Sequence, residues 1–271
     1  MLKGASAVGG RTPGATVAVT TPGGQEVTKG APTTVRTALT AGTRTAHQVS
    51  VALSAPRGWK VSAPVRHARI AAGTTRRDAL TLTAPRDSRS ADPVTVTATV
   101  RYRSAGAPRT AVHRFQVRPV PPAPAEDTWA SDLEWLSETN GYGPAERDRS
   151  NGESGAADGH PLTLAGKTYA KGLGTHADSG LEFYTGGRCS SFTADAGIDD
   201  EIADYGEVAF SVEADGKVLW TSPKLTGTSA PVAVDVPLGG ARHVRLRVTD
   251  TDGKKSGDHG DWAGARFHCS G

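Results

Sequence analysis

The stretch EVAFSVEADGKVLWTS, residues 207–222, is the clearest local signal in the chain. Every second residue from Val208 to Ala214 is apolar, and the alternation resumes after Asp215 and Gly216. A period of two places alternate side chains on one side of a β-strand. Asp-Gly is a preferred central pair of a two-residue hairpin turn. This stretch therefore predicts an antiparallel hairpin with one buried face.

The same period recurs through the rest of the chain, and helical periodicity is nearly absent. In the second half it recurs in GGRCSSFTADAGID (186–199), VAVDVPL (232–238), ARHVRLRVTD (241–250) and AGARFHCS (263–270). In the first half it recurs in ATVAVT (15–20), TVRTALT (34–40), HQVSVALS (47–54), DALTLTA (78–84), PVTVTATVRYR (93–103) and TAVHRFQVR (110–118). About seven strands in a hundred residues are typical of an immunoglobulin-like sandwich. The loop-rich second half favours a jelly-roll sandwich, so we expect an all-β protein.

A proline-rich segment, RPVPPAPAEDT at 118–128, separates the two halves and coincides with a reversal of charge. Residues 1–125 hold 18 Lys and Arg against 4 Asp and Glu, whereas residues 126–271 hold 13 against 24. Clustered prolines form a semi-rigid extended spacer. We therefore expect a first domain at 1–118, a linker at 119–128 and a second domain at 129–271.

The basic first half raises the question of nucleic-acid binding. Its arginines are scattered singly through alternating strand patterns, its aromatic residues are Trp59, Tyr102 and Phe115, and no nucleic-acid motif is present. Solvated strand faces explain this charge better, although weak contact with an anionic polymer stays open. No apolar run is long enough to span a membrane. We expect neither a nucleic-acid partner nor a membrane span.

From Trp129 to Cys269 the sequence resembles the NPCBM family, also classed as family-51 carbohydrate-binding modules. The resemblance rests on SDLEWLSETNGYGPAERDRSNGE, LTLAGKTYAKGLGTHADSGLEFY, CSSFTADAGIDDE, ADGKVLW and DHGDWAGARFHC. The first half resembles, less specifically, the immunoglobulin-like NPCBM-associated domain of α-galactosidases through VSVALSAPRGWKVSA and PVTVTATVRYR. The resemblance implies galactose-type glycan binding by an ancillary region of a secreted glycoside hydrolase. The chain has no βα alternation of a catalytic barrel.

A sugar site needs an aromatic face and a few fixed polar groups on loops. Tyr142 in ETNGYGP lies between glycines with no strand pattern around it, which favours ligand contact. KGLGTHADS places Lys171 and His176 around two glycines, and DRSNGES offers Arg149. The imidazole of His176 could bond an axial hydroxyl or could pin the loop. Turn capping is the alternative for the polar residues of DRSNGES.

The run GDHGDWAG, residues 257–264, supplies the other candidates: His259, Asp261 and Trp262. Strand parity places Trp262 opposite the buried Phe267, as an exposed sugar platform, unless a bulge at Gly264 resets the register. Packing in the interior is the alternative. We expect a loop-to-strand junction that lines the ligand mouth, with a structural duty for at least one acid.

Acidic groups in these loops could serve other chemistry. Asp199, Asp200 and Glu201, or Asp258 and Asp261, could act as the acid and base of a glycosidase. Oxygen-rich loops suit calcium better. However, DTDGKKSGDHGD at 250–261 has its glycine misplaced for an EF-hand and lysines in ligand positions. No cofactor is certain, a structural calcium stays open, and the metal ligands stay unknown.

The chain has two cysteines, Cys189 and Cys269, both in the second half. Two cysteines in one domain of an all-β protein suggest a disulfide. Closing a loop of that span would stabilise the domain by about 4 kcal/mol on the chain-entropy model.

These observations together predict a non-catalytic, carbohydrate-binding accessory region, either a monomer or part of a larger enzyme chain. A spacer without sugar binding is the alternative, and a glycosidase is a weaker one. We expect an extracellular location, although the opening MLKGASAVGG does not have the pattern of a signal peptide.

Overall fold

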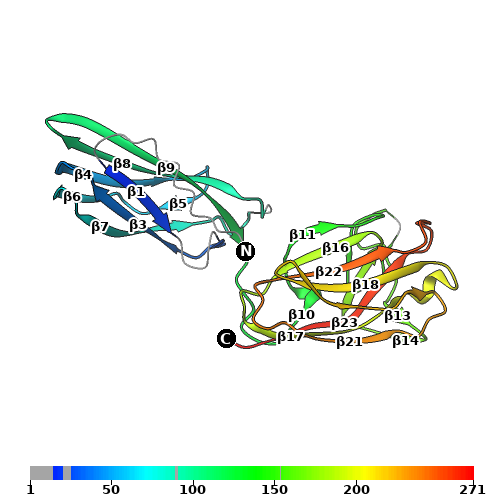
Figure 1. The fold of residues 1–271 in the computed structure, drawn as a ribbon. Coiled ribbons are helices and arrows are strands. Elements are labelled where there is room, and N and C mark those ends of the chain that lie inside the picture. The colour runs from blue at the N-terminus through cyan, green and yellow to red at the C-terminus, as the bar shows by residue number, and fades with distance from the viewer. Residues whose placement is uncertain (1–14, 21–25, 89–90, 153) are drawn as a thin grey trace. The chain divides into compact units, whose positions relative to one another are not determined.

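A computed structural model describes residues 15–20, 26–88, 91–152 and 154–271. The opening stretch considered above as a signal peptide therefore lies outside the described residues. The chain divides into two compact units, Met1–Val120 and Pro121–Gly271. Figure 1 shows strands layered face to face in each unit. No helix among the described residues is long and apolar enough to cross a membrane.

The first unit is a sandwich of two sheets, with strand orders β1-β3-β7-β5 and β2-β9-β8-β4-β6. Its strands are β1 (Ala15–Thr20), β2 (Glu26–Thr28), β3 (Thr33–Ala41), β4 (Ala46–Ser54), β5 (Lys60–Val61), β6 (Val65–Ile70), β7 (Thr75–Thr83), β8 (Val94–Ser104) and β9 (Ala107–Val120). Alternate residues of both sheets meet in an aliphatic core that includes Val35, Leu39, Val51, Leu80, Leu82, Val96 and Val100. The expected β-sandwich is confirmed. Strand β6 was not expected, because VRHARI carries two arginines and a histidine among its six residues.

The proline-rich segment begins inside a strand. Pro119 and Val120 belong to β9 and pair in parallel with Val27 and Thr28 of β2. Proline tolerates this position because the pairing of β9 with β8 ends at Val117, so one side of β9 is a free edge there. The segment between strands is therefore 121–127, shorter than the expected linker at 119–128.

The second unit is also a sandwich of two antiparallel sheets, ordered β12-β15-β23-β17-β21 and β11-β16-β22-β18-β19. Two further strands pair at the side of these sheets, β10 with β23 and β20 with β18. The strands are β10 (Thr128–Trp129), β11 (Trp135–Thr139), β12 (Glu146–Arg147), β13 (Thr163–Leu164), β14 (Lys167–Thr168), β15 (Gly172–His176), β16 (Ser179–Tyr184), β17 (Cys189–Ile198), β18 (Glu207–Ala214), β19 (Lys217–Thr221), β20 (Leu225–Thr226), β21 (Val232–Pro237), β22 (His243–Asp250) and β23 (His259–Cys269).

The hairpin expected at 207–222 is present as β18 and β19. Ala214 pairs with Lys217, and the two turn residues, Asp215 and Gly216, have φ of 46° and 78°. Positive φ at both central positions matches the twist of the flanking strands, which is why Asp-Gly suits this turn. The stretch KGLGTHADS instead differs from expectation. Its centre forms strand β15, which is buried along its whole length.

The core of the second unit is more aromatic than that of the first. Phe183, Phe192, Phe210, Trp262 and Phe267 are all fully buried between the two sheets. A disulfide joins Cys189 of β17 to Cys269 of β23, which lie directly opposite each other. The expected disulfide is therefore confirmed.

Candidate functional site

Two histidines meet at one end of the second sandwich. Strands β15 and β23 are antiparallel, and their register places His176 directly opposite His259. The two imidazole rings lie 5.3 Å apart, edge to face. Tyr142 joins them from the loop after β11, with its ring 6.0 Å from that of His176. Three of the expected site residues therefore gather in one place.

Asn140 positions the loop that carries Tyr142. Its side-chain amide donates to the carbonyl oxygen of Tyr142 at 2.7 Å, and its Oδ1 accepts from the backbone N–H of His176 at 2.8 Å. Tyr142 keeps 48% of its surface exposed. An Asn-Gly pair in a loop signals a turn, but it does not signal that the side chain reaches a neighbouring strand.

Both histidines use Nδ1 to contact an acceptor. Nδ1 of His176 lies 2.8 Å from the carbonyl oxygen of Ala177, and Nδ1 of His259 lies 2.9 Å from Oε1 of Glu201. A carbonyl or carboxylate oxygen requires a hydrogen on the facing nitrogen. In the neutral rings, each Nε2 therefore carries a lone pair. His176 keeps only 5% of its surface exposed, whereas His259 is half-buried, so Nε2 of His259 is the more accessible acceptor for a hydroxyl group.

Glu201 connects this end of the unit to the segment beyond β12. Its Oε2 accepts from the hydroxyl of Ser150 at 3.0 Å, while Oε1 holds His259. It lies in a short 3-10 helix, Asp200–Ile202, capped by Asp199, whose Oδ1 accepts from the Glu201 amide. The sequence showed an acidic group here, but only the tertiary contacts reveal that Glu201 orients a histidine.

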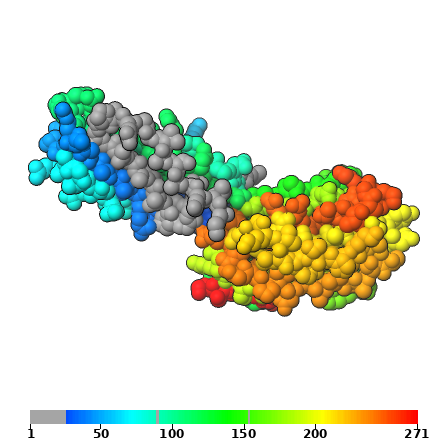
Figure 2. Space-filling model, viewed as in Figure 1, coloured from blue at the N-terminus to red at the C-terminus, as the bar shows by residue number. Residues whose placement is uncertain are grey.

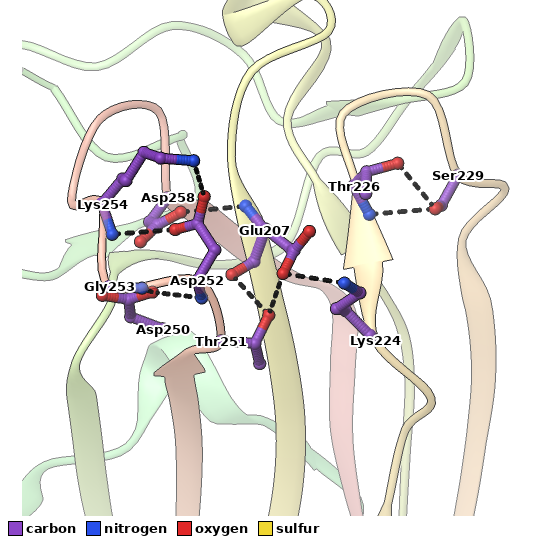
Figure 3. Close-up of polar contacts among 10 residues, drawn as sticks. All are labelled: Glu207, Lys224, Thr226, Ser229, Asp250, Thr251, Asp252, Gly253, Lys254 and Asp258. Atoms are coloured by element: carbon purple, nitrogen blue, oxygen red, sulfur yellow. Dashed lines mark hydrogen bonds and ion pairs between the residues drawn. The ribbon is translucent and has the colours of Figure 1, made fainter.

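The loop between β22 and β23 is closed by its own acidic side chains (Figure 3). Asp250 accepts hydrogen bonds from two backbone amides, and Asp252 accepts from both the amide and the ammonium of Lys254. Asp258 Oδ1 accepts from the amide of Glu207 at 3.0 Å. No three His, Cys, Asp or Glu side chains among the described residues are arranged to hold a metal ion. The structural calcium considered above stays a prediction.

A second exposed tyrosine lies beside this loop. Tyr205 keeps 66% of its surface exposed. A Cβ at Gly257 would lie 2.7 Å from the Tyr205 Cβ, so the two segments pack closely. In Figure 2 the yellow and orange-red segments accordingly meet at one end of the second unit. Sequence reasoning passed over Tyr205, because its neighbours 199–204 are mostly acidic and read as a polar loop.

Trp262 is not an exposed platform, so its expected ligand contact is wrong. It is fully buried and packs edge to face on Phe210, with ring centres 5.1 Å apart. The register between β17 and β23 shifts near Gly264, which has φ of 60°. This bulge adds one residue to β23, so Trp262 faces the same side as Phe267. The alternative of a register reset at Gly264 is the correct one.

Asp261 also cannot contact a ligand, because its side chain is fully buried. It lies on the outer side of its sheet, between Gly174 and Gly197 on the neighbouring strands. The backbone of 149–151 covers it there. A Cβ at Gly174 would lie only 2.4 Å from the carbonyl oxygen of Arg149, so glycine is needed for this approach.

The carboxyl of Asp261 faces that of Asp199. Both carboxyl oxygens of Asp261 lack a hydrogen-bond donor among the described residues. Burial, and then the neighbouring Asp199, raise the pKa of Asp261 well above its ordinary value. The raised pKa favours the protonated form of Asp261, which can donate a hydrogen bond to Asp199. Its full burial is consistent with a structural duty for this acid of DHGDW.

Lys171 and Arg149 lie elsewhere and hold the structure together. Lys171 pairs with Asp132 and Asp148 at 2.5 and 2.9 Å. It precedes β15, whereas His176 ends it, so about 16 Å of extended strand separates the two. Arg149 donates to the carbonyl oxygen of Ala157 at 2.7 Å. The structure therefore does not bring either residue to the histidine pair.

The model of the NPCBM/NEW2 domain matches residues 126–268, which contain every residue of the site just described. The chain belongs to the NPCBM/NEW2 family. The model of the NPCBM-associated, NEW3 domain of alpha-galactosidase matches residues 27–103. The NPCBM/NEW2 unit is a carbohydrate-binding accessory module of the kind found in glycoside hydrolases.

Two curated relatives are much longer than this chain. The "Putative endo-alpha-N-acetylgalactosaminidase" of Renibacterium salmoninarum is 40% identical over 228 residues, which are 82% of this chain and 15% of the relative. The "Alpha-1,3-galactosidase B" of Akkermansia muciniphila is 32% identical over 133 residues, 48% of this chain and 16% of the relative. The NPCBM/NEW2 chain therefore spans about one sixth of the relatives it matches.

Solved structures similar to this chain include two Clostridium perfringens proteins. One is the CBM51 of GH95 in complex with methyl-galactose, with 30% identity and a TM-score of 0.47 over 52% of this chain and 99% of that one. The other contains the CBM51-2 and INT domains of ZmpB, with 24% identity and a TM-score of 0.49 over 66% of this chain and 38% of that one.

Proposed function

We propose that the NPCBM/NEW2 unit binds the terminal galactose-type residue of a glycan at the site formed by Tyr142, His176 and His259. The observation that carries this proposal is the contact of an exposed aromatic ring with the histidine pair. A ring face suits the apolar C–H patch of a sugar, and fixed imidazole nitrogens suit its hydroxyls. Glu201 orients one of these nitrogens.

The names of both curated relatives support a galactose-configured ligand. One is described as an endo-alpha-N-acetylgalactosaminidase and the other as an alpha-1,3-galactosidase. Galactose and N-acetylgalactosamine share an axial hydroxyl at C4. We propose that one Nε2 of the histidine pair accepts a hydrogen bond from this hydroxyl.

We further propose that the chain acts without catalysis, as an extracellular region that delivers a glycoside hydrolase to its substrate. In this proposal, the two units, joined through 121–127, form one part of a longer protein that also contains the hydrolase. The disulfide supports an oxidising location, because such bonds persist outside the reducing cytosol.

Calorimetric titration with galactose, N-acetylgalactosamine and glucose tests the binding proposal. We expect binding of the first two sugars and weaker binding of glucose, whose C4 hydroxyl is equatorial. Tyr142→Ala should weaken binding more than tenfold, since truncating a well-used contact costs about 2 kcal/mol. Tyr169→Ala is the matched control, because Tyr169 contacts Asp195 near the opposite end of β15. A folded protein that binds none of these sugars would indicate a spacer instead.

A further inference from the structure

Arginines lie side by side across the outer face of one sheet of the first unit. Strand β4 lies between β6 and β8, and Ser50 of β4 is directly opposite both Arg66 and Arg101. Residues directly opposite on neighbouring strands point to the same side of the sheet. Val100 and Tyr102, which flank Arg101, are buried in the core. Arg66 and Arg101 therefore point outward, with a small serine between them.

A second row repeats this arrangement one step along the strands. His47 of β4 is opposite both Arg69 and Arg103. Arg114 of β9, opposite Thr97, adds a further charge. All of these arginines are exposed. We name this surface the basic face; it comprises Arg66, Arg69, Arg101, Arg103 and Arg114.

The charge of the basic face is not neutralised by neighbouring acids. Among the described residues, none of its five arginines forms an ion pair, and Arg103 donates to a backbone carbonyl, that of Gly106. The opposite sheet carries fewer cations on its outer face. The register places Arg36 and Arg77 outward on its central strands, and Lys60 of β5 lies opposite the outward Thr83. Among the described residues, the outer face of this sheet thus carries three cations, against five arginines on the basic face.

The spacing of the arginines suits a polymer with repeated anionic groups. Arg66 and Arg101 are two strands apart, which is about 10 Å, and Arg101 and Arg103 are about 7 Å apart along β8. A guanidinium binds a sulfate or carboxylate through two parallel hydrogen bonds. Several such contacts at once give an affinity that a single exposed ion pair does not.

We propose that the basic face binds a linear polyanionic glycan, one that carries sulfate or carboxylate groups along its length. Single-stranded nucleic acid fits less well, because its bases need aromatic rings to stack on. Tyr102 is buried, and Trp59 and Phe115 pack against the core of the first unit. The basic face is a binding surface additional to the sugar site of the NPCBM/NEW2 unit, and it engages the anionic groups of the polymer rather than a terminal sugar.

The test compares two triple variants that lose the same charge. Arg66→Gln/Arg101→Gln/Arg103→Gln alters the basic face. Arg36→Gln/Lys60→Gln/Arg77→Gln removes three exposed cations from the outer face of the opposite sheet and is the matched control. Binding of the full chain to immobilised heparin, polygalacturonate, uncharged dextran and a DNA duplex is measured at several salt concentrations. Melting temperatures establish that both variants are folded, as expected for exposed positions.

We expect the unaltered chain to bind heparin or polygalacturonate, but not dextran, with an affinity that falls as salt rises. The face variant should lose at least tenfold in affinity and should show a shallower salt dependence, by about two to three in the log–log slope. The control variant should keep most of its affinity. Heparin and polygalacturonate distinguish sulfate from carboxylate recognition.

Three results would overturn the proposal. Equal losses in the two variants would mean that net charge alone drives binding. Tighter binding of the DNA duplex would assign the face to nucleic acid. No binding of either polyanion by the unaltered chain would leave the arginines as solvated residues. Galactose affinity is measured in parallel, so a failure of the sugar site is distinguished from a failure of the basic face.

Discussion

Nδ1 of His259 lies 2.9 Å from Oε1 of Glu201, and this contact determines which ring nitrogen carries the hydrogen in the neutral ring. The carboxylate holds the hydrogen on Nδ1, so Nε2 of the neutral ring accepts. Glu201 is anchored in turn by the Ser150 hydroxyl. The orientation of a proposed ligand contact thus depends on a residue that need not touch the sugar.

Replacing Glu201 should change both the tautomer of His259 and the affinity for galactose. In Glu201→Leu the acceptor is lost, and we expect about tenfold weaker binding, the effect of one hydrogen bond to a charged group. Glu201→Gln keeps an oxygen that can accept and should recover much of the affinity. Nitrogen NMR of the imidazole reports the tautomer without any sugar. A Leu variant with an unchanged tautomer would remove Glu201 from this role.

Asp261 should make stability depend on pH. The pKa of Asp261 is raised in the folded state. The stability that its carboxyl contributes to the folded state is therefore fully present below the pKa of the unfolded chain, and it is lost as the pH rises through the pKa of the folded protein. Asp261→Asn keeps a neutral donor toward Asp199 and cannot ionise. We expect the variant to gain stability over the unaltered protein as pH rises from about 4.

Denaturant unfolding between pH 4 and 8 measures this difference. Asp235→Asn, at an exposed position of β21, is the matched control and should show no such trend. A stability difference between Asp261→Asn and the unaltered protein that stays constant over this range would contradict a protonated Asp261.

Trp262→Ala should destabilise the NPCBM/NEW2 unit by about 3–5 kcal/mol, because it opens a large cavity beside Phe210 and Phe192. Thermal and denaturant unfolding measure the loss. Leu219→Ala, at a position with 43% exposure, should cost far less. Where Trp262→Ala is still folded, galactose affinity should be nearly unchanged. A stable variant with no affinity would instead return Trp262 to the site.

Removing the disulfide should lower stability by about 4 kcal/mol on the chain-entropy model. The bond joins residues 80 apart in sequence. The double variant Cys189→Ala/Cys269→Ala should melt at a lower temperature than the unaltered chain. Reductant should lower the melting temperature of the unaltered chain but not that of the double variant. Titration of two free thiols in the denatured, unreduced protein would contradict the bond.

The segment 121–127 should be the site of limited proteolysis between the units. Glu126 is exposed, so a glutamate-specific protease is expected to cut after it. This cut should release two folded fragments, one that ends at Glu126 and one that begins at Asp127. Glu126→Gln should remove this cleavage. Fragments that unfold once separated would show that the units are not independent domains.

The sequence determined the architecture because strand periodicity and turn chemistry are local. Residues 207–222 specify the β18–β19 hairpin through alternation and one Asp-Gly turn, and the cysteine pair was evident from composition. The family followed from ordered blocks of sequence. The exposed loop position of Tyr142 could also be predicted, since glycines flank it and no strand pattern includes it.

The composition of the site was decided only by tertiary structure. His176 and His259 are far apart in the chain and meet because β15 and β23 pair in one register. The side that Trp262 faces depends on a bulge at Gly264, and a shift of one residue reverses every side chain beyond it. Likewise, Asp261 and Glu201 both read as loop acids. Burial beside Asp199 raises the pKa of Asp261, and contact with His259 makes Glu201 a positioning residue. Such roles depend on neighbours brought together by folding, and local sequence carries no record of them.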